Sequence, residues 1–150
     1  MTEKGELEQL LHRLFSEQLL AVLGTQGRRG PYGSLVAFYA TDDLKNILFA
    51  TARSTRKYEN LMQTPQVSMV IDSRTNKERD FQEAIAVTVT GKVKEVIGSE
   101  RGGFETLYLK KHPSLLDFAQ SPACALLKIE VETYYIVRQF QQVDELRVGD

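Results

Sequence analysis

The spacing of the first apolar runs is the feature that most constrains the fold of this chain. Residues 19–23, 32–40 and 47–51 have the length and composition of strands, and only the short segments 24–31 and 41–46 separate them. Parallel strands need a crossover connection of about a dozen residues or more. These strands are therefore predicted to be antiparallel neighbours, with the Gly- and Pro-rich turn 24–31 closing a hairpin.

Later segments continue this pattern and add helices. Apolar residues between 6 and 18 recur with helical spacing, and the charged segment 72–82 is predicted to be a solvated loop. Gly91, in the middle of a long strand, indicates a bulge of the kind that barrels use. The further predicted strands are 67–71, 84–96 and 123–137, and the further helices are one that starts near residue 55 and ends before Pro65, one at 99–111 and one at 113–118.

These elements predict a mainly β fold with flanking helices (α+β), in which six antiparallel strands form a sheet that closes on itself. No repeat or linker divides the chain, so residues 1–150 are expected to be a single domain. Its predicted parts are an N-terminal helix at about 4–18, a barrel at about 19–137 and a polar tail at 138–150 without clear periodicity.

Composition excludes several classes of function. With 42% apolar residues and a net charge of −1, the chain has enough material for a core and no basic surplus for nucleic acid or anionic membranes. Its polar start is unlike a signal peptide, and it has no apolar run of the roughly 20 residues that span a membrane. The one cysteine, Cys124, is expected to be an inert core thiol. A soluble cytoplasmic protein is expected.

The segment 47–62 carries the clearest chemical signal. A short strand ends in a turn that holds Ser54, Thr55, Arg56 and Lys57, and a helical pattern follows. A helix N-terminus offers free backbone N–H groups, a Ser or Thr can cap it, and two cations can bind phosphate oxygens. The segment therefore predicts a phosphate site. The alternative is that both cations are ordinary solvated residues beside a capped helix.

The order of these elements resembles the FMN-binding split-barrel family, which includes pyridoxamine 5′-phosphate oxidase. The resemblance covers roughly residues 19–137 and rests on several short motifs in the same order. The motifs are Gly-x-x-Gly-Pro at 27–31, Tyr-Gly-Ser-Leu-Val-Ala-Phe at 32–38, Ile-Leu-Phe-Ala-Thr at 47–51, Ser-Thr-Arg-Lys-Tyr-Glu-Asn-Leu at 54–61, Thr-Pro-Gln-Val-Ser-Met-Val-Ile at 64–71 and Val-Thr-Gly-Lys-Val at 89–93.

The resemblance implies a split barrel that forms a homodimer, with FMN bound at the subunit interface. It assigns the FMN phosphate to Arg56 and Lys57, and it assigns the isoalloxazine ring to the second strand. It also implies that the partner chain completes the site, with Tyr135 as one further candidate for this role. The implied cofactor-binding residues are Ser34, Leu35, Val36, Ala37, Ala50, Thr51, Ser54, Thr55, Arg56, Lys57, Tyr134 and Arg138.

Departures from the family pattern concern the substrate. The chain has no C-terminal Arg-x-His motif for a substrate phosphate, and Ala86 stands where the vitamin B6 enzyme would offer a polar cofactor contact. The resemblance therefore favours an oxidoreductase that passes electrons from reduced FMN to another small planar substrate. The alternatives are a non-enzymatic flavin or haem protein, in which His112 is the haem candidate, a deazaflavin-dependent reductase that uses Arg28 and Arg29, and a cofactor-free barrel.

Overall fold

The computed structural model describes residues 3–139 and 141–149 of the chain. Its elements are α1 (Lys4–Glu17), β1 (Leu20–Gly27), β2 (Gly30–Ala40), β3 (Asn46–Ala52), α2 (Arg56–Gln63), β4 (Gln66–Asp72), α3 (Asp80–Glu83), β5 (Ala86–Glu95), α4 (Ser99–Lys111), the 3₁₀ turn η1 (Pro113–Leu115), α5 (Leu116–Gln120), β6 (Cys124–Arg138) and β7 (Gln142–Arg147). The strands form one antiparallel sheet in the order β3-β2-β1-β4-β5-β6-β7.

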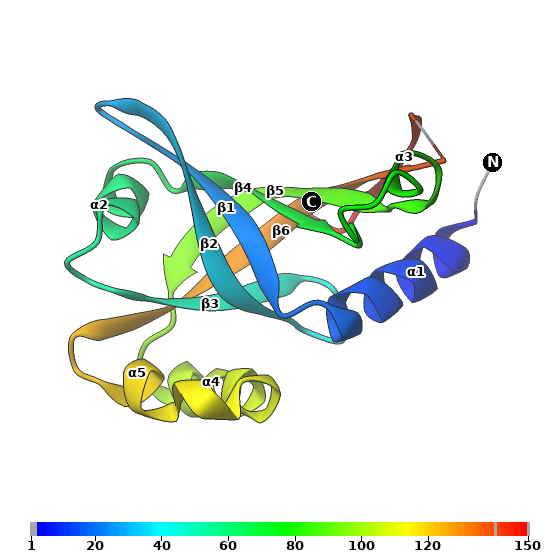
Figure 1. The fold of residues 1–150 in the computed structure, drawn as a ribbon. Coiled ribbons are helices and arrows are strands. Elements are labelled where there is room, and N and C mark those ends of the chain that lie inside the picture. The colour runs from blue at the N-terminus through cyan, green and yellow to red at the C-terminus, as the bar shows by residue number, and fades with distance from the viewer. Residues whose placement is uncertain (1–2, 140, 150) are drawn as a thin grey trace.

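Pairing between β3 and β6 closes the first six strands into a barrel (Figure 1). Asn46 faces Glu130 at one end of this pairing and Ala52 faces Cys124 at the other. The six-stranded antiparallel barrel predicted from the sequence is confirmed. Strand β7 extends the sheet along a free part of the β6 edge, and it lies in the tail 138–150, where the sequence shows no clear periodicity.

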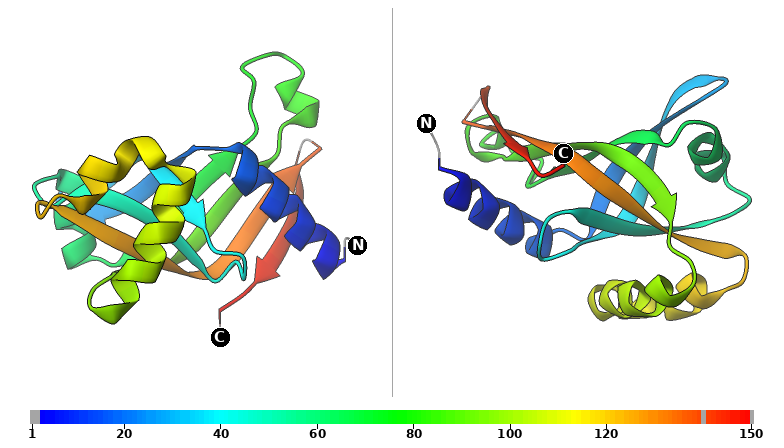
Figure 2. Two further views of the ribbon diagram at one scale, coloured as in Figure 1. Left: turned by 90° about the horizontal axis from the view of Figure 1, so that it is seen from below. Right: turned by 180° about the vertical axis from the view of Figure 1, so that it is seen from behind.

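Four of the helices lie around the barrel in three places. Helices α1 and α2 lie at opposite ends, and α4 and α5 lie outside it, next to β3 (Figures 1 and 2). Alternation along β3 serves both sides, because Phe49 packs inside the barrel with Phe38 while Leu48 packs outside it with Tyr108 and Leu126.

Within the two described ranges, no helix has the length and apolar character needed to cross a membrane.

The first hairpin is longer than the glycines at 24–31 predict. Strands β1 and β2 continue through most of this segment, and only the exposed Arg28 and Arg29 lie in the turn. The Thr25 side chain is buried and accepts a hydrogen bond from Asn60 Nδ2 of α2, at 3.0 Å. A Cβ atom at position 27 would collide with the Asn60 side chain. Glycine is therefore needed there because α2 packs closely on the hairpin.

Two other expectations concern β5 and the segment before it. The register of β5 on β6 shifts between Thr90 and Gly91, which confirms the predicted bulge. The charged segment 72–82 is mostly exposed, as expected of a solvated loop, but its end enters the single helical turn α3. Asp80 stabilises this turn by accepting the backbone N–H of Thr75 at 2.8 Å.

Candidate phosphate and ring site

The N-terminus of α2 has the capped arrangement that the sequence predicts. Of the two expected caps, Thr55 is the N-cap and Ser54 is exposed. The Thr55 hydroxyl accepts the backbone N–H of Tyr58 at 3.3 Å and lies 3.0 Å from the Thr51 hydroxyl. It also donates to the carbonyl of Ala52 at 2.9 Å. These bonds fix the end of β3 against the start of α2, where helix N–H groups without intrahelical partners attract an anion.

Arg56 and Lys57 are the first two residues of α2. The guanidinium of Arg56 lies over the ring of Tyr32, with Cζ 4.2 Å from the ring centroid, and so points toward β2. Burial lowers the pKa of Lys57, which interacts electrostatically with Cys124 at the start of β6. In the described part of the chain, neither cation forms an ion pair with a carboxylate. Both are therefore available to an anion at the helix N-terminus.

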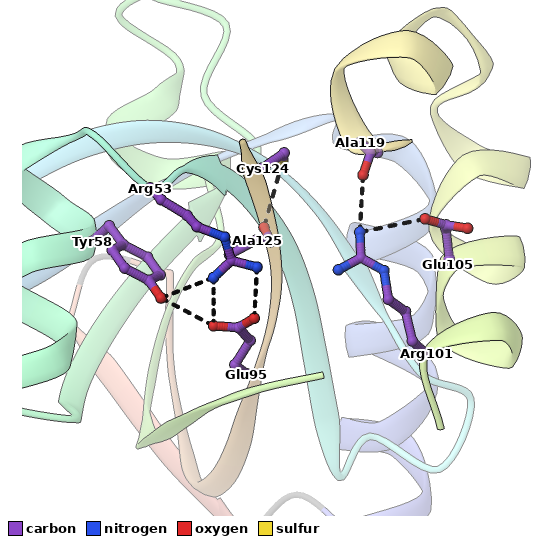
Figure 3. A network of polar contacts seen from close by, with 8 residues as sticks. All are labelled: Arg53, Tyr58, Glu95, Arg101, Glu105, Ala119, Cys124 and Ala125. Carbon is purple, nitrogen blue, oxygen red and sulfur yellow. Dashed lines mark hydrogen bonds and ion pairs between the residues drawn. The ribbon is translucent and has the colours of Figure 1, made fainter. Parts of the chain in front are cut away.

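Arg53, three residues before Arg56, has a different role. Its guanidinium donates to both Glu95 carboxylate oxygens, at 2.9 and 2.8 Å, and Tyr58 donates to the same carboxylate at 3.0 Å (Figure 3). The Arg53 hydrogen bonds hold the pKa of Glu95 below its ordinary value, against the opposing effect of burial, and raise the pKa of Arg53. Arg53 therefore ties β3 to β5 and is not free for a ligand.

A cavity of about 490 Å³ lies beside this network, and Arg53, Arg101 and Cys124 contribute to its lining. Arg101 is held by the carbonyl of Ala119, to which it donates at 3.0 Å (Figure 3). The Cys124 side chain is buried, and burial raises its pKa, so the thiol stays protonated near neutral pH. This environment agrees with the inert thiol expected from the sequence.

Strands β2 and β3 separate next to the helix N-terminus. They pair only from Phe38↔Phe49 to Ala40↔Ile47, whereas residues 30–37 of β2 pair with β1 on one edge alone. We call the unpaired stretch between residues 30–37 of β2 and the end of β3 the β2–β3 split. Phe38 donates its N–H toward Leu19, on the β1 side of the strand. Successive residues of a strand direct their backbone groups to opposite edges, so Leu35 directs its N–H and carbonyl to the split.

The predicted ring contacts on β2 fall on different sides of the strand. The side chain of Val36 lies in the barrel core, and that of Leu35 is 62% exposed on the outside. The carbonyl of Ala37 accepts a hydrogen bond from Tyr108. The hydroxyl oxygen of Ser34 is buried and has no hydrogen-bond partner among the described residues. An unpaired buried hydroxyl and an unpaired strand edge therefore lie on the same stretch of β2, and both fit a ligand with polar atoms on its edge.

The family model for pyridoxamine 5′-phosphate oxidase matches residues 7–138. The chain belongs to this family. No curated protein sequence matches it. The family match and the barrel topology agree, because the matched residues include all six strands of the barrel.

Solved structures with the same fold come from several bacteria. A heme binding protein from Mycobacterium smegmatis is 15% identical, with a TM-score of 0.82 over 98% of this chain and 59% of that chain. General Stress Protein 26 from Bacillus anthracis is 18% identical, with a TM-score of 0.72 over 95% of this chain and 99% of that one. The heme storage protein HutZ from Vibrio cholerae is 18% identical, with a TM-score of 0.70 over 84% of this chain and 90% of that one. At these identities the likeness concerns the fold.

Two residues that the pyridoxamine 5′-phosphate oxidase resemblance adds to the site lie elsewhere in the chain. Tyr134 is fully buried in the core, where its hydroxyl donates to the carbonyl of Leu44 at 2.6 Å. Arg138 lies at the α1 end of the barrel, with its guanidinium 3.5 Å from Asp144. Neither residue is next to α2 of its own subunit, so their part in the site stays a prediction that requires a partner subunit.

Two tyrosines next to the candidate site are not among the residues predicted from the sequence. Tyr32 orients Arg56 through its ring, and Tyr108 hydrogen-bonds to β2 where the split begins. The apolar spacing of the helix at 99–111 indicates that Tyr108 packs inward, but no local pattern identifies the strand that its hydroxyl contacts. Tyr32 belongs to the motif at 32–38, which predicts contacts between the strand backbone and a ligand and does not indicate a contact between the Tyr32 ring and Arg56.

Proposed function

We propose that this protein binds FMN, with the phosphate at the N-terminus of α2 and the isoalloxazine ring along the β2–β3 split. The observation that carries the proposal is the position of Arg56 and Lys57 at one end of an unpaired strand edge, where neither cation pairs with a carboxylate among the described residues. A flavin nucleotide needs such a pair of features, a cluster of phosphate ligands and a flat slot with a few polar groups. The family membership supports the same cofactor.

The phosphate would be held by groups that are already fixed in place. Thr55 caps the helix and Thr51 supports it, so the backbone N–H groups at the start of α2 need no rearrangement to bind an anion. Arg56 supplies a planar donor set, and Lys57 supplies a point charge. A phosphate beside Lys57 would offset the burial that lowers the pKa of this amine, so binding would stabilise its charged form.

The ring would be positioned by the backbone of β2. Leu35 directs an N–H and a carbonyl toward the split, and the Ser34 hydroxyl has no hydrogen-bond partner in the part of the chain that the structure describes. A donor and an acceptor suit the polar edge of a flavin, which carries both kinds of group. When bound, the flavin supplies hydride or electron transfer to a small planar substrate, and the protein provides position and electrostatics.

We further propose a homodimer formed through the outer face of β1, β2 and β4. Leu20, Leu35 and Val70 are 51%, 62% and 37% exposed on this face. Val22 faces both Leu35 and Val70 in the sheet register, so the exposed apolar side chains are contiguous. Such a patch on a small domain is typical of a protein interface. In a dimer of this kind, Arg138 and Tyr135 would be candidates to complete the partner's site.

Haem is the second candidate cofactor, because two structures with this fold are described as heme proteins. The side chains of this chain favour it less. His112 is buried, and its Nε2 lies 2.7 Å from the carbonyl of Phe38, a contact that it would have to give up to ligate iron. His12 is exposed on α1 and lies outside the split. A deazaflavin, which also needs a phosphate site and a flat slot, is the other alternative.

The deciding experiment is the visible spectrum of the purified protein, with mass analysis of what heat releases. Flavin bands and released FMN support the proposal, and a Soret band supports haem. A colourless protein that also fails to bind added FMN contradicts the flavin assignment. Mass analysis separates FMN from a deazaflavin.

A double variant tests the phosphate assignment directly. Arg56→Ala with Lys57→Ala is expected to weaken FMN binding by about a hundredfold or more, because the variant would lose two charge-assisted hydrogen bonds to the phosphate. The matched control is Lys77→Ala with Arg79→Ala, which removes the same charge from the exposed segment at α3. Retention of stoichiometric FMN by the first variant would contradict the assignment.

A further inference from the structure

The hydroxyl of Tyr108 lies between two backbone groups that would otherwise pair with each other. It donates to the carbonyl of Ala37 on β2 at 3.1 Å, and the backbone of Ala50 on β3 approaches the same hydroxyl and acts to lower its pKa. In the register of these strands, Ala37 and Ala50 are the next facing pair after Phe38 and Phe49. The ladder between β2 and β3 therefore ends where the Tyr108 hydroxyl enters it.

An inserted hydroxyl changes the distance between the strands. A direct ladder bond brings N and O to about 2.9 Å, whereas two hydrogen bonds in series through an oxygen hold the same groups several ångströms apart. The phenol ring is 1% exposed and packs with Leu48, Cys124 and Leu126, so the hydroxyl has a fixed position. Burial raises the pKa of Tyr108 to about 12, so the hydroxyl remains a donor at neutral pH.

We propose that Tyr108 is a positioning residue whose hydroxyl holds β2 and β3 apart and so sets the closed end of the β2–β3 split. The opposite end of the split is marked by Tyr32, over which Arg56 lies. The two tyrosines thus delimit the strand edge available to a bound ring. The role of Tyr108 in strand separation does not depend on a ligand, whereas its effect on a flavin rests on the proposed function.

Tyr108 is not needed merely to attach α4 to the barrel. Two neighbouring residues at the same end of α4 also anchor the helix, one to α1 and one to β2. Lys111 donates to the carbonyl of Phe15 at 2.8 Å, and His112 lies 2.7 Å from the carbonyl of Phe38. Lys111→Met therefore gives a matched control. It removes a polar anchor of α4 that reaches the carbonyl of Phe15 and the ring of Phe38, and it leaves the bond from the Tyr108 hydroxyl to Ala37 in place.

The strand separation is tested on the ligand-free protein. Tyr108→Phe keeps the ring and removes the hydroxyl, so the fold is expected to persist while the Ala50 N–H changes its partner. In amide nuclear magnetic resonance spectra, we expect the Ala50 and Ala37 signals to shift in Tyr108→Phe and to stay unchanged in Lys111→Met. An Ala50 signal that is the same in wild type and Tyr108→Phe would overturn the proposal.

The consequence for the site is tested by FMN titration. Tyr108→Phe is expected to bind FMN roughly tenfold more weakly and to change the visible bands of the bound flavin, since the ring would meet a narrower split. Lys111→Met is expected to stay within about twofold of wild type, with unchanged bands. Equal affinity and bands in wild type and Tyr108→Phe, or equal losses in both variants, would overturn the positioning role. If wild type itself binds no FMN, the proposed function fails, whereas the amide test still decides the strand separation.

Discussion

Arg53 and Glu95 join the end of β3 to the end of β5 through two parallel hydrogen bonds, at 2.9 and 2.8 Å. The residues are far apart in the chain, and their pairing fixes the turn that precedes α2. Tyr58, inside α2, donates to the same carboxylate. The position of the α2 N-terminus therefore depends on β5 as well as on β3, although β5 supplies no group to the candidate phosphate site.

Replacing Glu95 by Gln should lower the free energy of unfolding by up to about 1 kcal/mol, since the ion pair is bidentate but partly exposed. The lowered pKa of Glu95 means that its contribution is complete only above the ordinary value of 4.5 and is lost as the pH falls through that lowered pKa. Urea unfolding of wild type and Glu95→Gln should therefore differ at pH 7 and converge in strong acid. A difference that grows toward low pH would contradict this role of the pair.

The cap of α2 gives a second prediction. Thr55→Ala removes the acceptor for the Tyr58 N–H and the hydroxyl contact with Thr51, and it should cost about 1 kcal/mol in urea unfolding. Thr55→Ser keeps the oxygen and serves as the control. If both variants lose the same stability, the loss comes from the methyl group and the capping assignment is wrong.

Ser34 should show opposite effects on stability and on binding. Its buried hydroxyl has no partner among the described residues, so Ser34→Ala should leave the stability of the ligand-free protein unchanged or raise it by about 1 kcal/mol. If the hydroxyl contacts FMN, the same variant should bind FMN several-fold more weakly. Ser16→Ala, exposed on α1 at the opposite end of the barrel from α2, is the control that removes a hydroxyl away from the split. Equal FMN affinity in wild type and Ser34→Ala would remove this residue from the site.

Lys111 gives a prediction in the alkaline range. Burial lowers its pKa from an ordinary value near 10.5 to about 8, so between these values the unfolded chain binds more protons than the folded one. Stability relative to Lys111→Met should therefore rise with pH from about 8 to about 10.5, with a limiting slope of about 1.4 kcal/mol per pH unit. Thermal unfolding at several pH values measures this difference. A flat difference would show that the amine has an ordinary pKa in the folded protein.

The barrel was predictable because its strands alternate and its turns are short. Val67, Met69 and Ile71 on β4 all point inward, as their spacing predicts, and the bulge at Gly91 falls where a glycine interrupts a long strand. The start of α2 was predictable for a local reason. A strand end, a Thr cap and two cations are contiguous in the chain, so their arrangement depends little on tertiary structure.

Contacts between distant segments could not be predicted in the same way. Arg53, Arg56 and Lys57 look alike in sequence, and only the approach of Glu95 separates the structural cation from the two available ones. The Tyr108 hydroxyl meets β2 because α4 packs across it, which no local pattern shows. Strand β7 could not be predicted for a different reason. It adds to the sheet edge with few buried side chains, so apolar and polar residues do not alternate along it.

Strand β6 pairs with β5 on one edge, and on the other edge it pairs first with β3 and then with β7. The barrel therefore cannot close until residues 124–130 meet residues 46–52, and contacts this distant in sequence form slowly. During synthesis, most of the chain leaves the ribosome before β3 and β5 find their last partner. A product shortened before β6 would display two apolar strand edges, which are the surfaces through which nascent β proteins aggregate and chaperones recognise them.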